Sequence, residues 1–159
     1  MTTSRPEIAI ATSAGALRVS LSFDRPAQPR DNLSGGATRS EAGPVGPVAT
    51  VRFEGLALHR VAWSGWVEVN LGGGAAVAGR ANVNRADRRP SDYDQRDRVE
   101  RRIVAEVEAH REEILFGDLA RATRDYERAT AIEAAQAKVE TARARLAEAE
   151  AALAAALAA

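Results

Sequence analysis

The chain contains no cysteine, and only one of its 22 basic residues, Lys138, is a lysine. Without cysteine, a disulfide framework, a thiolate metal site and a cysteine nucleophile are excluded. The preference for arginine, together with abundant alanine, is typical of a GC-rich coding sequence, as in actinobacteria and their phages. This composition indicates an origin and not a function.

Aromatic residues account for only 4% of the 159 residues, and much of the 45% hydrophobic content is alanine. Because alanine buries little apolar area, the core of large side chains must be small. The length allows one modest core, or a small domain with a helical appendage, but not two full domains.

The chain also lacks long apolar runs and an excess of charge of either sign. No stretch approaches the roughly 20 apolar residues of a membrane-spanning helix, and the N-terminus lacks the charged start and apolar core of a signal peptide. The formal net charge is zero, so there is no bulk attraction to nucleic acid or to an anionic membrane. We expect a cytoplasmic or virion-associated protein, with neither nucleic acid nor a membrane as its main partner.

The first half of the chain has the alternation of period two that is typical of β-strands. Residues 17–23 alternate apolar and polar side chains, which predicts a strand with one face on a core. Ile8 and Ile10 indicate an earlier strand, and the Ser13–Gly15 segment predicts a hairpin turn between the two.

Strand character resumes at Val48 and gives about six short strands in all, one of them running from Leu56 to Trp63 with His59 inside it. The Gly72–Gly74 run predicts a hairpin turn, because only glycine adopts positive φ without steric cost. Residues 1–89 are therefore expected to form a small antiparallel β sandwich or barrel-like domain.

A long segment rich in proline and glycine interrupts these strands at 25–47. Loops of this length without regular structure are usually functional arms, segments ordered by a partner, or disordered. Disorder is the favoured interpretation, and ordering against a neighbouring subunit is the alternative.

The second part of the chain, 90–159, changes to a helical pattern. Ser91 and Asp94 resemble a capping box, so a helix is expected to begin near Asp92. Gly117 either ends this helix, giving a helical hairpin, or lies within one long helical arm; we favour the break. The fold class is therefore α+β. The first helix has an apolar face formed by Val99, Ile103, Val107, His110 and Ile114.

The most regular feature of the sequence is a heptad repeat near the C-terminus. Large apolar residues recur every seven positions, and an alanine follows each of them three positions later. With the large residues at a and alanine at d, this heptad stripe is narrow and lets another helix approach closely. Its members are Ile132, Val139, Leu146 and Leu153 at a, and Ala135, Ala142, Ala149 and Ala156 at d.

The heptad stripe needs a partner helix. In a parallel dimer Lys138 at g faces Arg143 at the following e, which disfavours a strong parallel zipper. Close antiparallel packing fits better, either within the chain against 92–116 or between subunits.

Signatures of catalysis and metal binding are weak. His59 and His110 lie in different contexts, no G-x-S-x-G segment is present, and the acidic residues after Ser91 lack the glycine and closing glutamate of a calcium loop. We expect no catalytic residue, no metal and no cofactor.

The 80–102 junction is rich in arginine, but interleaved acids favour a solvated, ion-paired surface. Trp66 is expected to face outward, on the side opposite Val67 and Val69. An outward tryptophan is a candidate interface anchor. The candidate partner contacts are Trp66, Arg85, Arg88 and Arg89.

These patterns favour a non-enzymatic structural or assembly protein that docks into a multi-subunit complex through its β domain and helical arm. Protein subunits are the expected partners, in a homo-oligomer or a larger assembly. A bacteriophage virion, with the chain as a capsid decoration or tail component, is the hypothesised context. The alternative is nucleic-acid binding through the arginine-rich junction 80–102, by a groove that follows the backbone.

Overall fold

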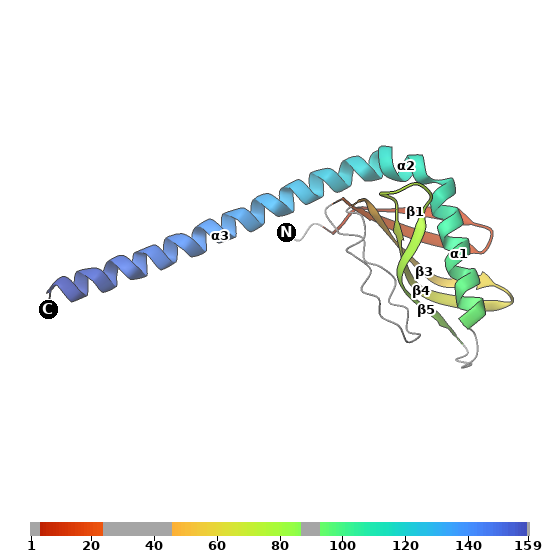
Figure 1. Ribbon diagram of the computed structural model, residues 1–159, viewed down its shortest axis with the longest axis horizontal. Helices are drawn as coiled ribbons and strands as arrows, with labels where there is room; N and C mark the ends of the chain where they lie inside the picture. Colours follow the sequence, from red (N-terminus) through yellow and green to blue (C-terminus); the bar gives the residue numbers. More distant parts are fainter. Residues whose placement is uncertain (1–3, 24–45, 87–92, 159) are drawn as a thin grey trace. The chain divides into compact units, whose positions relative to one another are not determined.

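The computed structural model describes residues 4–23, 46–86 and 93–158. The chain divides into two compact units, Met1–Thr123 and Arg124–Ala159. The loop predicted at 25–47 lies almost entirely outside the described residues, as do Arg88, Arg89 and the predicted helix cap at Ser91. Figure 1 shows the elements in chain order: β1 Glu7–Thr12, β2 Gly15–Ser22, β3 Val48–Leu58, β4 Val61–Asn70, β5 Val77–Arg85, α1 Tyr93–Ala109, α2 Arg111–Phe116 and α3 Asp118–Ala158.

The five strands form one antiparallel sheet in the order β1-β2-β3-β4-β5, so each strand pairs with its neighbours in the sequence. The α+β prediction is confirmed. The second layer against this sheet is α1 and not a second sheet, because the described strands all belong to one meander. The described strands thus form an antiparallel sheet, as expected, without the second sheet of a sandwich.

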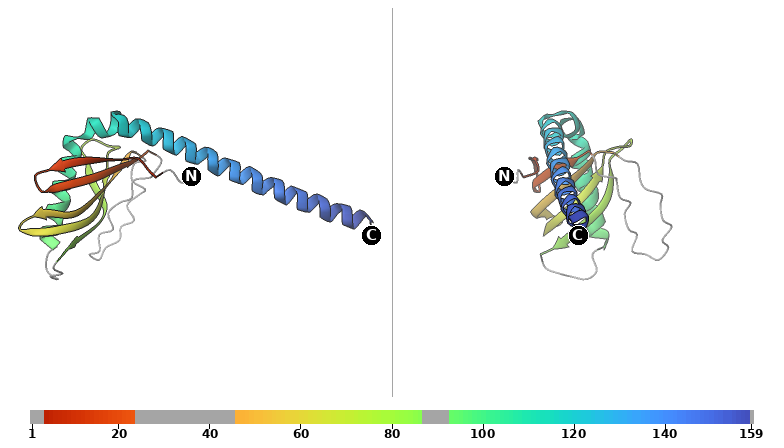
Figure 2. Two further views of the ribbon diagram at one scale, coloured as in Figure 1. Left: turned by 180° about the vertical axis from the view of Figure 1, so that it is seen from behind. Right: turned by 90° about the vertical axis from the view of Figure 1, so that its left-hand side faces the viewer.

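The core lies between the sheet and the helices that follow it. Val67 and Val69 of β4 are fully buried, as are Val99 and Ile103 of α1. α1 contacts β4 and β5, and Figure 2 shows it against one face of the strands in both views. The apolar face predicted around Val99 is therefore covered by the sheet.

The packing of α1 bears on the choice between two partners for the heptad stripe, the 92–116 segment of the same chain and a helix of another subunit. Val99, Ile103, Val107 and Ile114 have no exposed surface, so the apolar face predicted on 92–116 is already covered. The face of 92–116 that an intramolecular contact was expected to use is therefore occupied by the sheet, which favours the other alternative, a helix from another subunit.

A hairpin turn at His59 and Arg60 joins β3 to β4, which corrects the continuous strand predicted from Leu56 to Trp63. Both turn residues have positive φ, 53° and 62°, the backbone that matches the twist of a tight hairpin. The indole Nε1 of Trp63 donates to the Leu58 carbonyl oxygen at 3.1 Å and so ties the two strands together beside the turn. The described residues therefore form five strands where six were expected.

The connection between β4 and β5 is a glycine-rich hairpin, as predicted, but the reason for glycine differs. Of the described glycines, those with positive φ are Gly15, Gly55 and Gly65, so the positive φ predicted at 72–74 is wrong. A Cβ on Gly72 would instead lie 2.7 Å from the Gly46 Cα. Glycine is required there because two backbones meet.

The helical part is interrupted twice. α1 ends before His110, whose Nδ1 lies 2.9 Å from the Glu106 carbonyl oxygen. Gly117, in an extended conformation with φ −82° and ψ −163°, separates α2 from α3, so the long C-terminal helix is bent at the position of the predicted break. Among the described residues, no helix combines the length and apolar character needed to cross a membrane.

Candidate assembly interface

α3 continues without interruption through the unit that begins at Arg124. Seventeen of its 41 residues are alanine, the residue with the highest helix propensity. Helices much longer than about 15 residues with such a composition form in water without tertiary packing. The helix is therefore stable through its own backbone hydrogen bonds, and its side chains are available for contact.

The heptad stripe is exposed along this helix. Ile132 and Val139 are 51% and 50% exposed, and Leu146 and Leu153 are 59% and 62% exposed. The alanines at d are exposed as well. Four large apolar side chains on one side of a helix, each at least half in water, form the kind of surface that marks a protein contact.

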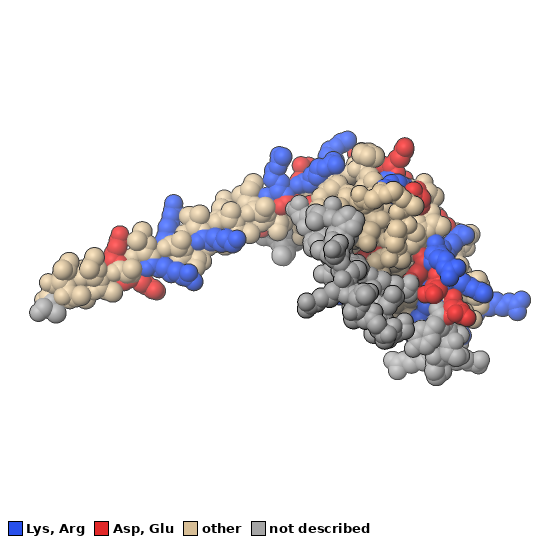
Figure 3. All heavy atoms as spheres, viewed as in Figure 1, with Lys and Arg blue, Asp and Glu red and all other residues tan. Residues whose placement is uncertain are grey.

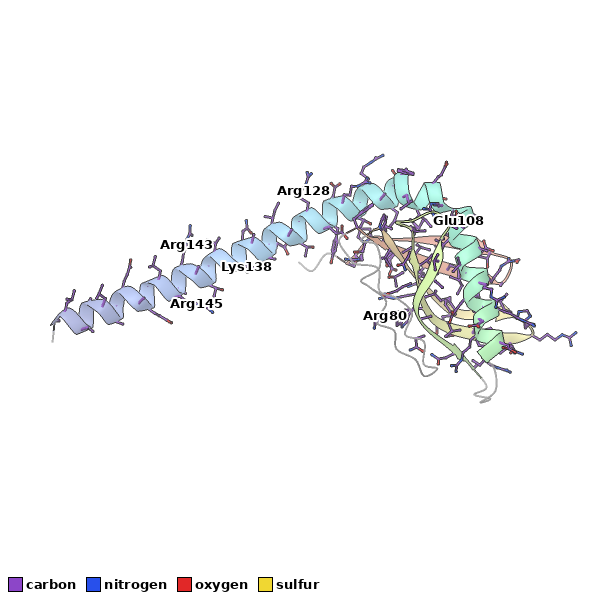
Figure 4. All side chains as sticks on the ribbon, viewed as in Figure 1. Arg80, Glu108, Arg128, Lys138, Arg143 and Arg145 are labelled. Atoms are coloured by element: carbon purple, nitrogen blue, oxygen red, sulfur yellow. The ribbon has the colours of Figure 1, made fainter. Side chains whose placement is uncertain are left out.

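Charged side chains flank the heptad stripe on both sides. Lys138 and Arg145 occupy g positions, and Arg143 and Glu150 occupy e positions. Figure 4 shows Lys138 and Arg145 projecting from one side of α3 and Arg143 from the other, and Figure 3 shows basic side chains leaving this helix in both directions. Among the described residues, these three cations make no hydrogen bond or ion pair.

A hollow lies on the g side of the heptad stripe. Lys138, Thr141, Ala142 and Arg145, spaced at i, i+3, i+4 and i+7, line it together with Ala137. Four residues in this spacing form the hole that receives a side chain from a facing helix in a coiled coil. Because alanine lies at its base and two cations stand at its ends, the hollow is both shallow and positively charged.

Of the other predicted contact residues, the two that the structure describes, Trp66 and Arg85, lie on opposite faces of the sheet. Trp66 is half-buried on the face of β4 opposite Val67, as expected, with Arg52 and Asn82 beside it on the neighbouring strands. Arg85 pairs with Trp63 on the other face of the sheet. Arg88 and Arg89 lie outside the described residues.

Arg85 has a local structural role. Its guanidinium stacks 5.8 Å from the centre of the buried Trp63 ring and donates to Gln95 of α1 at 3.2 Å. It therefore joins the end of β5 to α1. In the same arginine-rich junction, Arg102 forms an ion pair with Glu106 at 2.9 Å, one of the pairs that the i, i+4 spacing predicts.

Sequence reasoning missed a polar clamp on the glycine-rich hairpin. Arg111 Nη2 donates to the carbonyl oxygens of Leu71 at 2.8 Å and Gly73 at 3.0 Å, and Nη1 lies 3.1 Å from Glu108 Oε2. The same Glu108 oxygen accepts from the Ala76 backbone N–H at 3.0 Å. No local pattern could have revealed this clamp, because its partners lie about forty residues apart.

Phe116 is a second residue that sequence reasoning missed. Its side chain is 76% exposed at the end of α2. The adjacent Gly117 was the only local signal, since a residue at a helix break is free to leave the apolar face. An exposed aromatic side chain is a candidate contact residue.

Few groups suited to catalysis or metal binding come together. Within 4–23, 46–86 and 93–158, no group of three or more His, Asp or Glu side chains is placed to hold a metal ion. His59 lies in an exposed hairpin turn, whereas His110 is half-buried between α1 and α2. The two histidines therefore belong to different sites, as their sequence contexts predict.

Comparison with known proteins adds no functional assignment. No protein-family model, curated protein or solved structure matches the chain. The heptad stripe and its flanking charges are thus the most developed candidate site that the described residues offer.

Proposed function

We propose that this chain is a non-enzymatic structural protein that joins a multi-subunit assembly through the heptad stripe of α3. The observation that carries the proposal is the exposure of all four large a residues on a continuous helix. A coiled-coil contact buries these residues against a partner.

The strength of such a contact follows from its area. Fully burying an exposed Val, Leu or Ile side chain contributes about 1.5 to 3 kcal/mol. Since the a residues are already about half covered by their own helix, docking adds about 1 kcal/mol for each, or about 4 kcal/mol from this chain. Association costs roughly 4 to 15 kcal/mol. The stripe alone supports a weak contact, which suits an assembly where neighbouring contacts add to it.

The unit before residue 124 would supply further contacts in such an assembly. Half-buried Trp66 on the sheet and exposed Phe116 at the end of α2 are the aromatic candidates. A bacteriophage virion, with this chain on the capsid or tail, is the context we propose from its size and arginine-rich, cysteine-free composition.

The test is the association state of the full-length chain in the cells that make it. Leu146→Asp places a carboxylate at the centre of the stripe, and Ala144→Asp places the same group at an f position away from it. We expect the native chain and Ala144→Asp to sediment with a large complex, and Leu146→Asp to sediment as free chain.

The unit before residue 124 provides the control for this test. Because Leu146 is 59% exposed, its substitution should leave the unfolding temperature of the 4–123 unit unchanged. If Leu146→Asp stays in the complex, or if all three chains sediment as monomers, the stripe does not carry the assembly.

A further inference from the structure

The identity of the partner helix can be inferred from the charges beside the heptad stripe, an inference that rests on the proposed function. We infer that the stripe binds a helix of another protein whose own apolar stripe is flanked by acidic residues, and not a second copy of this chain. The e and g positions of this chain pair differently with a parallel copy, an antiparallel copy and an acidic helix.

A parallel pair of identical helices gains nothing from its charges. In this arrangement each g residue faces the e residue five positions later on the partner. Lys138 then faces Arg143 of the second copy, which is repulsive, and Arg145 faces Glu150, which is attractive. The two kinds of pair occur equally often and their effects cancel.

An antiparallel pair of identical helices is worse. The alignment that overlaps the whole stripe, from Ile132 to Ala156, is centred on Ala144. In antiparallel coiled coils e residues face e residues and g residues face g residues. Arg143 and Arg145, one position on either side of the centre, would therefore each meet the same arginine of the second copy. Two like-charge contacts would lie at the middle of the interface.

The apolar face of the preceding helix α1 is already occupied. The apolar face of α1 is fully buried against the sheet, as Val99, Ile103 and Val107 show. The described residues thus leave a helix of another molecule as the favoured partner, and that partner must avoid the repulsion that a second copy brings.

An acidic partner helix gains three attractive contacts beside the stripe against one repulsive contact, with Glu150. Carboxylates at its e and g positions would face Lys138, Arg143 and Arg145, which make no ion pair among the described residues. The hollow over Ala142 lies between two of these cations and admits a side chain from the partner. Because alanine occupies every d position, the helices come close enough for the flanking charges to meet.

The experiment uses the full-length chain and designed probe helices about four heptads long. All probes carry Leu at a and Ala at d, and they differ only in having Glu, Gln or Lys at every e and g. Binding to each labelled probe is measured by fluorescence anisotropy at low salt and at about 0.5 M salt. We expect the Glu probe to bind about tenfold more tightly than the Lys probe at low salt, with a smaller difference at high salt.

A charge reversal in the chain provides an independent readout. Arg145→Glu should weaken binding of the Glu probe and strengthen binding of the Lys probe, while leaving the stripe intact. Ala144→Glu, which adds the same charge away from the stripe, should change the ratio of the two affinities much less. If Arg145→Glu only destabilised the helix, binding of the Glu probe and of the Lys probe would both weaken.

The possible failures are distinguishable. If the Glu and Lys probes bind equally well, or if the chain alone forms a dimer that Leu146→Asp abolishes, the acidic partner is refuted while docking through the stripe stands. If no probe binds and the chain does not self-associate, both this inference and the proposed function fail.

Discussion

Gly65 is the position where a single methyl group should do the most damage to the sheet. It lies in the middle of β4, paired with Phe53 on one side and Val83 on the other. Its φ is +143°, a region that residues with a Cβ rarely adopt, and an added Cβ would overlap the Asn82 carbonyl oxygen. Gly65→Ala therefore combines backbone strain with a collision against β5.

The expected magnitude follows from these two effects. Backbone strain of this kind costs about 1 to 3 kcal/mol. Moving β5 away from the methyl group also disturbs about two ladder hydrogen bonds, each with a net value of about 1 kcal/mol. We expect Gly65→Ala to lower the free energy of unfolding by about 4 kcal/mol, which corresponds to a fall of about 15 °C in Tm for a unit of this size.

The assay and its control follow from the same hairpin. Trp63 is fully buried, so its fluorescence reports unfolding of the sheet without interference from the helical signal of α3. Gly73→Ala is the matched control, because a Cβ there has no heavy atom within 4 Å, and its Tm should change by no more than about 2 °C. Similar Tm values for the two variants would refute the argument that β5 packs against the backbone of Gly65.

Two further predictions concern other polar groups of the same unit. Arg111→Ala removes the hydrogen bonds to Leu71 and Gly73 and should lower the free energy of unfolding in urea by about 2 kcal/mol. Arg111→Lys keeps the charge but lacks the forked guanidinium, so it should retain only part of this free energy. If Arg111→Lys is as stable as the native chain, the positive charge alone, and not the forked hydrogen bonding, stabilises the hairpin. Thr123 is fully buried, and its hydroxyl has no hydrogen-bond partner among the described residues. Thr123→Val should therefore raise the free energy of unfolding by about 1 kcal/mol in thermal melts, and a lower Tm would show that the hydroxyl is satisfied.

Local periodicity was enough to predict most strands and the helical character of 93–158, but not the interruption at His110. The alternation over residues 17–23 corresponds to β2, and the spacing of Val99, Ile103 and Val107 corresponds to the buried face of α1. In both cases the side chains that repeat with the period of the element are also those that pack. These features depend on neighbours in the sequence and are visible without the fold.

The hairpin at His59 was missed although the sequence contained a signal for it. Leu56 and Leu58 occupy even positions, whereas Val61 and Trp63 occupy odd ones. A continuous strand cannot place all four on one face, but a two-residue turn can, because Leu58 then lies opposite Val61. Histidine and arginine are uncommon in tight turns. The residue types therefore did not indicate a turn, although the apolar side chains change from even to odd positions there.

The choice between two partners for α1 could not be made from periodicity. The sequence shows an apolar face on 92–116 and two apolar surfaces that a helix could bury, one on the sheet and one formed by the heptad stripe. The sheet presents buried Val67, Val69 and Val83, whereas half of the stripe is alanine. Since burial of large side chains contributes more free energy, α1 packs on the sheet and the stripe is left exposed.

The regularity of the stripe is itself an argument that it serves an interface. Alanine alone would make a better isolated helix, because Ile132 and Val139 are β-branched and lower helix propensity by a few tenths of a kcal/mol each. Half-exposed apolar side chains add nothing to the stability of a helix that is already stable in water. Their strict seven-residue spacing matches the period of a coiled coil and not the period of 3.6 of a lone helix. The spacing therefore has a physical use only when a second helix lies against it, and the flanking arginines favour an acidic one.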